Sequence, residues 1–212
     1  IAVDATGNVY LTGRTFSTDF PVTSGAVQKA PGGGEQGDAF ITKLDPQAKT
    51  LIYSTYFGGQ NDDYGKAIAV DSSGAAYVVG YTMSSGLPKA VNLNGTYNTG
   101  SFVLKLNPRG DNIEYLSILG GSGMVLGYGI SVDSSGSAYI AGTSRATNLP
   151  ATPQAAQSTY KGGDREGFLA KLSPDGKSLQ YCSYLGGSGV EDLFGLAVDR
   201  DGNAVVVGST DS

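Results

Sequence analysis

Apolar and polar residues alternate along most of the chain in short runs, and these runs return in a fixed order. The tetrapeptide IAVD at 1–4 recurs as IAVD at 68–71, ISVD at 130–133 and LAVD at 196–199. A second apolar run follows each copy and closes on a glycine, 12 residues after the tetrapeptide begins. Self-similarity at this spacing predicts a propeller, a solenoid or another array of similar units.

Each complete repeat contains four such runs, which we designate A to D. In the first repeat, A is followed by VYLTG at 9–13, FITKLD at 40–45 and LIYSTYF at 51–57. Their period of two predicts β-strands. From the phenylalanine of run C to the next run A there are 28 residues in every repeat, so only the B–C connection varies in length. The expected first residues of strand A are 1, 68, 130 and 196.

The connections between the runs have the composition of tight turns. Each A–B connection begins with Asp and ends with Gly, as in Asp4 to Gly7. An Asp at this position bonds to its own turn backbone, and Gly supplies a positive φ. Four antiparallel strands that meander from A to D form a propeller blade. We therefore predict an all-β propeller-type array of about three and a half four-stranded blades, at 1–67, 68–129, 130–195 and 196–212.

The long B–C loops are the variable part of this plan. We expect the loops at 14–37, 81–99 and 143–165 to lie on one face with the D–A connections, and the A–B and C–D turns to lie on the other. Function is expected on the loop-bearing face, because loops carry binding residues on a rigid framework.

Composition narrows the classes of function. The chain has 33 Gly and 13 Tyr but no His, and its formal charge is −5. The acidic balance argues against nucleic acid as a partner, and no apolar run is long enough for a membrane-spanning helix. Without His, a hydrolytic triad lacks its usual base and a zinc site lacks its usual ligands. We therefore predict no catalytic residue and no cofactor, with calcium as the one open alternative.

The calcium alternative rests on acidic residues in two D–A connections. Carboxylates beside backbone carbonyls suit calcium. The competing interpretation, which we favour, is a solvated acidic loop, because repeat two has MVL at 124–126 in this place. Acids on the loop face also leave open a carbohydrate-binding or carbohydrate-active propeller, although nothing places the two carboxylates that a glycosidase needs. The acids concerned are Asp62, Asp63, Glu191 and Asp192.

Several single positions carry open interpretations. Asn94 begins an N-x-T triplet and is a candidate glycosylation site. Cys182 stands in a strand column with Ser54 and Leu116, which indicates a small buried residue. The lysine of strand C either pairs with an acid, such as the Asp of the A–B turn, or reaches solvent along a packed stem. The tyrosine of strand D is expected in the core. These columns are Lys43, Lys105 and Lys171, and Tyr53, Tyr115 and Tyr181.

The order of the motifs resembles a known family. FPVTSGAVQ at 20–28, GDAFITKLDP at 37–46 and YSTYFGG at 53–59 look like the bacterial seven-bladed β-propeller repeat (SBBP) family, and TNLPATPQAAQ at 147–157 and GFLAKLSPDG at 167–176 resemble it again. The resemblance implies a secreted or cell-surface bacterial protein, usually a module of a longer chain, with no known catalysis. We therefore expect a non-enzymatic scaffold or interaction module.

An incomplete blade implies a partner. Propellers typically have about four to eight blades. A strand edge without a neighbouring strand tends to pair with another chain. The chain opens directly on a strand without a signal-peptide pattern, so we expect a fragment or a processed form. We expect Leu196–Gly208 to meet strands from other copies, in a filament or another oligomer, or from further blades of a longer chain.

Overall fold

The structure is a computed structural model that describes residues 1–33, 37–95 and 99–212. Its regular structure in these residues is entirely β, with no helix, and so it contains no helix that could cross a membrane. The strands are β1 Ala2–Val3, β2 Val9–Thr15, β3 Asp38–Leu44, β4 Leu51–Phe57, β5 Asp63–Val70, β6 Ala76–Thr82, β7 Ala90–Asn92, β8 Gly100–Leu106, β9 Ile113–Leu119, β10 Val125–Val132, β11 Ala138–Ser144, β12 Glu166–Leu172, β13 Leu179–Leu185, β14 Glu191–Val198 and β15 Ala204–Thr210.

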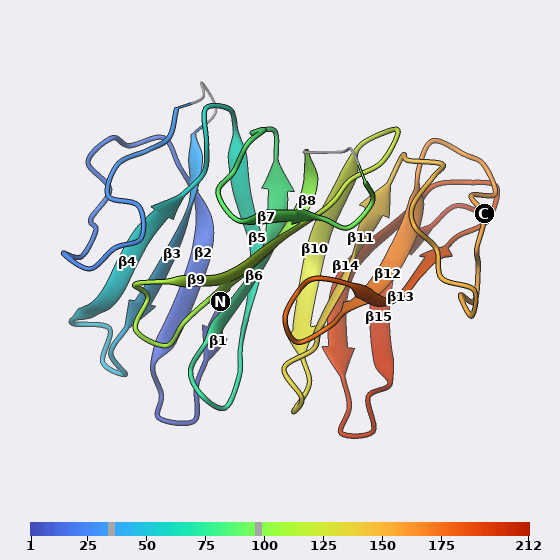
Figure 1. The fold of residues 1–212 in the computed structure, drawn as a ribbon. Helices are drawn as coiled ribbons and strands as arrows, with labels where there is room; N and C mark the ends of the chain where they lie inside the picture. The colour runs from blue at the N-terminus through green and yellow to red at the C-terminus, as the bar shows by residue number, and fades with distance from the viewer. Residues whose placement is uncertain (34–36, 96–98) are drawn as a thin grey trace.

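The strands form sheets that follow one another in chain order (Figure 1). The first blade has the order β1-β2-β3-β4, the second β5-β6-β8-β9, the third β10-β11-β12-β13, and β14-β15 form a half-blade. All of these pairings are antiparallel, which confirms the predicted fold class. The second blade has one strand more than expected: β7, from its B–C connection, pairs in parallel with β9.

The predicted start of strand A is wrong in three repeats. The strands begin at Asp63, Val125 and Glu191, five residues earlier than residues 68, 130 and 196, so the predicted blade boundaries cut through β5, β10 and β14. The physical reason is a β-bulge, which breaks the alternation that the pattern relies on. In β5 the register shifts between Gly65 and Ala67, and the corresponding positions of β10 and β14 shift in the same way.

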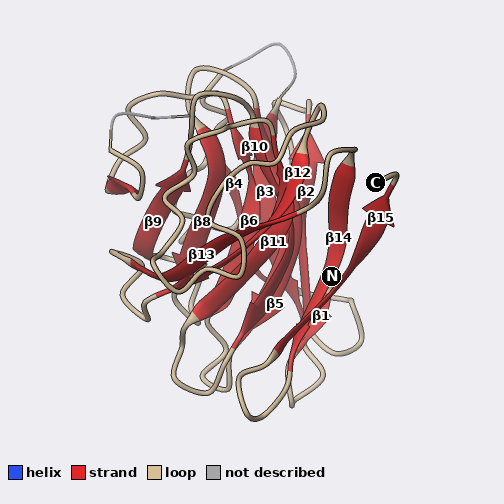
Figure 2. Cartoon of the chain, turned by 90° about the vertical axis from the view of Figure 1, so that its right-hand side faces the viewer, coloured by secondary structure: helices blue, strands red, loops and turns tan. Residues whose placement is uncertain are grey.

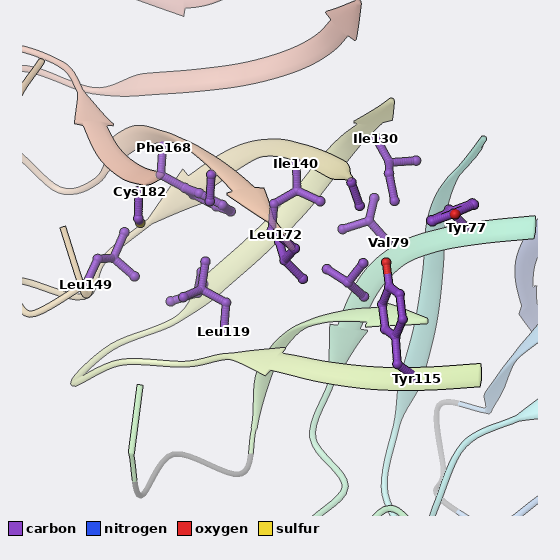
Figure 3. Packing of buried hydrophobic residues seen from close by; sticks show 14 of the residues in the cluster. Tyr77, Val79, Tyr115, Leu119, Ile130, Ile140, Leu149, Phe168, Leu172 and Cys182 are labelled. Atoms are coloured by element: carbon purple, nitrogen blue, oxygen red, sulfur yellow. The ribbon is translucent and has the colours of Figure 1, made fainter. Parts of the chain in front are cut away.

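Buried side chains join each blade to the next. One hydrophobic cluster joins the first blade to the second, and another joins the second blade to the third. Figure 3 shows the latter cluster, in which Tyr77 and Val79 face Ile130 and Ile140. The approach is close because strand A carries a glycine at the contact. A Cβ on Gly127 would lie 2.3 Å from Cγ2 of Val79. The A–B turns of all the blades lie along the lower edge of the array in Figure 1.

The outer edge of each complete blade is covered by its own B–C loop. In the first blade, Thr23 N–H donates to the Ser54 carbonyl at 3.0 Å and Tyr56 N–H donates to the Gln28 carbonyl at 3.1 Å. The third blade repeats this arrangement, with Thr152 N–H bonded to the Cys182 carbonyl. In the second blade β7 covers β9 instead. The B–C loops therefore occupy main-chain groups that an outer strand would otherwise expose.

The half-blade has a different environment. Among the described residues, β15 pairs only with β14 and forms the free edge of its sheet. Figure 2 shows the molecule with this side facing the reader. Val205 and Val207 of β15 are 64% and 66% exposed. The equivalent side chains of β6, Tyr77 and Val79, are fully buried.

Candidate functional site

The acids predicted as calcium ligands lie at the contacts between blades. Asp63 is the first residue of β5 and Glu191 the first residue of β14, and both are buried. The interpretation of a solvated acidic loop is therefore wrong for these two residues. Asp62 and Asp192 are partly buried beside them. The four acids do not form one group: Asp62 and Asp63 lie at the first junction, between the first and second blades, and Glu191 and Asp192 at the third, between the third blade and the half-blade.

At the first junction, Asp63 faces a second acid that sequence analysis did not identify. Asp38 begins β3 in the first blade and is fully buried. Gly58 lies between the two carboxylates, because Oδ1 of Asp38 and Oδ2 of Asp63 are both within 2.7 Å of the position that a Cβ on Gly58 would take. Only a residue without a side chain leaves room for this approach. The main chain joins the same blades here, since Asp63 N–H donates to the Gly37 carbonyl at 3.1 Å.

Each carboxylate of the first junction has hydrogen bonds on only one of its oxygens. Gly59 N–H and Ser84 Oγ each donate to Oδ2 of Asp63 at 2.8 Å, and Gly32 N–H donates to Oδ2 of Asp38. Oδ1 of Asp38 and Oδ1 of Asp63 are buried without a hydrogen-bond partner. A buried polar atom without a partner costs free energy, and a charged one costs more.

The electrostatics of this pair disfavour two negative charges. Burial, together with the charges of Asp63 and Asp62, raises the pKa of Asp38 to about 6 against the bond from Gly32. Burial also raises the pKa of Asp63, against the bonds from Gly59 and Ser84. No described ion pair joins either carboxylate to Lys or Arg.

The third junction has the same plan with longer acids. Glu166 begins β12 and faces Glu191 across Gly186, where a Cβ would lie 2.4 Å from Oε2 of Glu191 and 2.9 Å from Cγ of Glu166. Protein donors reach both oxygens of each carboxylate here. Glu166 accepts bonds from Gln157 Nε2 at 2.6 Å and from the N–H groups of Lys161 and Gly162, and Glu191 accepts bonds from Gly187 N–H at 3.1 Å and Thr210 Oγ1 at 3.0 Å.

The second junction has the same backbone without the acids. Gly100 begins β8 in place of Asp38, and Val125 begins β10 in place of Asp63. Ala146 stands where Ser84 donates to Asp63, and both Val125 and Ala146 are fully buried. The acid pair is therefore not required to join one blade to the next.

Asp192 is occupied by an ion pair. Arg165 donates from Nε and Nη2 to its two carboxylate oxygens at 2.7 Å each. This bidentate pair holds the pKa of Asp192 below its usual range. In the described part of the chain, no group of three or more acidic or thiol side chains is arranged to hold a metal ion. The calcium prediction can therefore draw on at most a pair of carboxylates, at the first or the third junction.

The A–B turns form a regular hydrogen-bond network at the other end of strand A from the junction acids. In the second turn, Asp71 accepts bonds from Ser73 N–H, Ser73 Oγ and Ala75 N–H, and the hydroxyl of Tyr77 donates to its other oxygen at 3.0 Å. This pattern recurs around Asp4 and Asp133, and it confirms the turn interpretation of this aspartate column. Tyr10 also reaches the next turn, where its hydroxyl donates to the Gly74 carbonyl at 3.2 Å.

In two of three blades the lysine of strand C pairs with the aspartate of the A–B turn, which is one of the two interpretations left open by the sequence. Lys171 contacts Asp133 at 3.0 Å and Lys43 contacts Asp4 at 3.7 Å. Lys105 instead pairs with Glu114 at 2.9 Å, so the expected partner is wrong in the second blade. The repeat has an acid on the neighbouring strand D only there, since Ile52 and Gln180 hold that position elsewhere.

The remaining candidate residues are Cys182, the tyrosines of strand D and Asn94, and they lie in different environments. Cys182 is buried, and burial raises the pKa of its thiol to about 12, which fits a packing role. Tyr53 and Tyr115 lie in the core, and Tyr181 is partly buried. Nδ2 of Asn94 donates to the carbonyls of Gly120 and Asn148 at 3.0 and 2.9 Å. Thr96 of this triplet lies outside the described residues, so glycosylation at Asn94 stays a prediction.

Comparison with known families agrees with this architecture. The model of the SBBP beta-propeller repeat matches residues 52–88 and 114–150. Two segments of the chain are therefore SBBP β-propeller repeats. Each SBBP match runs from strand D of one blade through strands A and B of the next, so it spans a junction, with Asp63 inside the first match and Val125 inside the second. A search of curated proteins found no match to the chain.

Proposed function

We propose that this chain is a non-enzymatic scaffold module of an extracellular or cell-surface bacterial protein, and that it binds a further blade of its own kind through the half-blade. The repeats establish the propeller module. The observation that supports the scaffold role is the exposed apolar face of β15 together with the groove beside this strand.

The outward face of the half-blade has the side chains of an inter-blade contact. Val205 and Val207 occupy the positions of Tyr77 and Val79, which the third blade covers completely. Valines in their place, more than 60% exposed, give a flat apolar surface suited to a glycine-bearing strand A like β10. Such a strand comes from another copy of this chain or from further blades of a longer one.

A groove beside β15 supports the same partner. It has a volume of about 450 Å³ and lies between the end of β13 and the half-blade, lined among others by Leu185, Val206 and Gly208. In the second blade, Phe102 of β8 fills the equivalent position. Its ring lies 4.9 Å from that of Phe57, the counterpart of Leu185, and within 2.7 Å of where a Cβ on Gly80 would be. The groove therefore suits an aromatic side chain on a strand added beside β15.

The energetics favour association of this kind. Each large apolar side chain that becomes fully buried contributes roughly 1.5–3 kcal/mol. Association costs about 4–15 kcal/mol in lost freedom. Several such residues on each partner are enough to offset that cost, and a blade-to-blade contact supplies several.

Sedimentation velocity across a hundredfold range of concentration tests the proposal. We expect the wild-type chain to form larger species as concentration rises. The double variant Val205→Lys/Val207→Lys should sediment as a monomer, because it places two charges on the apolar face. Ile52→Lys is the matched control, since Ile52 is 44% exposed on β4 in the first blade. A wild-type chain that stays monomeric throughout would rule out another copy as the partner, and an Ile52→Lys variant that dissociates equally would contradict the role of the half-blade.

The carbohydrate alternative gains no support from the acids that suggested it. Asp63 and Glu191 are buried between blades, and Asp192 is paired with Arg165. These carboxylates are therefore not placed to flank a sugar ring.

A further inference from the structure

The first and third junctions differ in how many of their carboxylate oxygens accept hydrogen bonds from the protein, and this difference points to a ligand. In the third junction Gln157 accepts a bond from Gly186 N–H through Oε1 and donates from Nε2 to Glu166 at 2.6 Å. Gln28 has the same place in the first junction and accepts from Gly58 N–H at 3.1 Å, but its Nε2 donates to the Ala30 carbonyl and makes no bond to Asp38. The shorter acid leaves an oxygen that the protein does not use.

Two such oxygens belong to the pair of acids that meet at the first junction. Oδ1 of Asp38 and Oδ1 of Asp63 are both buried without a partner, on side chains that are 0% exposed. Their carboxylates approach each other around Gly58, whose missing side chain gives them room. Buried carboxylates are normally paired with a cation or coordinate a metal, and the described ion pairs include neither residue.

We propose that Asp38 and Asp63 bind one divalent cation, calcium by the chemistry of its ligands, and that this ion joins the first blade to the second. Two hard carboxylate oxygens suit calcium better than a softer transition metal. Water and main-chain oxygens complete its coordination. Calcium also fits better than magnesium, because it accepts irregular oxygen geometry and loses its water more readily.

The other two junctions lack the features that suit the first junction to calcium. Gly100 and Val125 offer the second junction no carboxylate. The third junction has both glutamates, but protein donors already occupy their oxygens. We therefore expect one calcium ion per chain at the first junction, although two junctions contain acid pairs.

Thermal unfolding and calorimetric titration together test this site. With 10 mM CaCl₂ in place of EDTA, at matched ionic strength and pH 7.5, the Tm of the wild-type chain should rise by about 3–6 °C. Magnesium at the same concentration should raise it less. Isothermal titration should give one site per chain, with a dissociation constant of about 0.1–1 mM, as in extracellular calcium modules.

Two isosteric variants and one matched control complete the experiment. Asp38→Asn and Asp63→Asn should each abolish the calcium shift while keeping the Tm in EDTA at or above that of the wild type, because each removes a buried charge without changing the shape. Glu191→Gln removes a charge at the third junction and should keep the full shift. The proposal is overturned if calcium has no effect on the wild type, if Asp63→Asn keeps the shift, or if Glu191→Gln loses it.

Discussion

The first and second junctions join their blades with the same backbone but with opposite chemistry. Both place the first residue of strand A against the preceding blade, and both reach it through a bulged strand. The first junction has two carboxylates and a serine at this contact, and the second has Gly100, Val125 and Ala146. The apolar version shows that the fold needs no acids here, and so the acids of the first junction cost stability unless something neutralises them.

The largest expected effect comes from placing an acid in the apolar junction. Val125→Asp should lower the free energy of unfolding by roughly 3–5 kcal/mol at pH 7.5, because it buries a charge with no donor prepared for it. Val125→Ala is the control and should cost about half as much, since it removes only buried methyl groups. Urea denaturation measures both. If the two variants were equally stable, the second junction would tolerate a charge and the comparison would fail.

An intermediate effect should appear in the pH dependence of the protein in EDTA. Asp38 has a pKa of about 6 in the fold against 3.8 as its ordinary value, so the folded state binds more protons between these limits. The free energy of unfolding therefore falls as the pH rises from about 4 through 6, by up to about 2–3 kcal/mol. Chemical denaturation in a series of buffers measures this slope.

The turn acids give the opposite slope at lower pH. Burial alone would raise the pKa of Asp4 and of Asp133, but hydrogen bonds outweigh it and hold both pKa values well below the ordinary range. Their contribution is present above pH 4 and is lost as the pH falls further. Stability in EDTA should therefore be greatest near pH 4, and Asp38→Asn should remove the decline between about pH 4 and 6. A wild-type profile that rises steadily to pH 8 would contradict the first-junction assignment.

The smallest effect concerns the ion pair at the third junction. Arg165→Gln removes the bidentate contact with Asp192, but the arginine side chain is 30% exposed and the pair is screened by salt. We expect a loss below about 1 kcal/mol, greater at low than at high ionic strength. Arg109→Gln, which removes the exposed contact with Asp111 in a turn, is the comparison and should change stability less. A loss of several kcal/mol at Arg165 would mean that ion pairing, rather than apolar contact, holds the half-blade in place.

The sequence predicted the strands and their order well because these depend on local signals. Alternation of period two and turns closed by glycine are visible within a few residues, and constant spacing links the copies. The start of strand A was missed for the same reason. The bulge at residues 65–67 and the glycines around it interrupt the alternation, although pairing with β6 continues back to Asp63. β7 was missed because only its contact with β9 makes it a strand.

The acid pairs were only half visible. Asp63 and Glu191 were identified, but their partners Asp38 and Glu166 lie 25 residues earlier in the chain and in the preceding blade. No local motif connects positions that meet only when two blades pack together. A signal was nevertheless present in the repeats themselves: acids begin strand C in the two repeats whose following strand A begins with an acid, and both are lost together at Gly100 and Val125.

The loops that cover the outer strands also determine how these molecules can meet. Sheets with bare edges can add neighbours sideways and grow into disordered aggregates. Here Thr23 and Gln28 in the first blade, and Thr152 and Gln157 in the third, occupy main-chain groups of the outer strand, as β7 does in the second. The outer strands of the three complete blades are therefore closed to an added strand, while β15 of the half-blade has a free edge. Copies joined through the half-blade, as we propose, would meet at unlike surfaces, away from these outer strands.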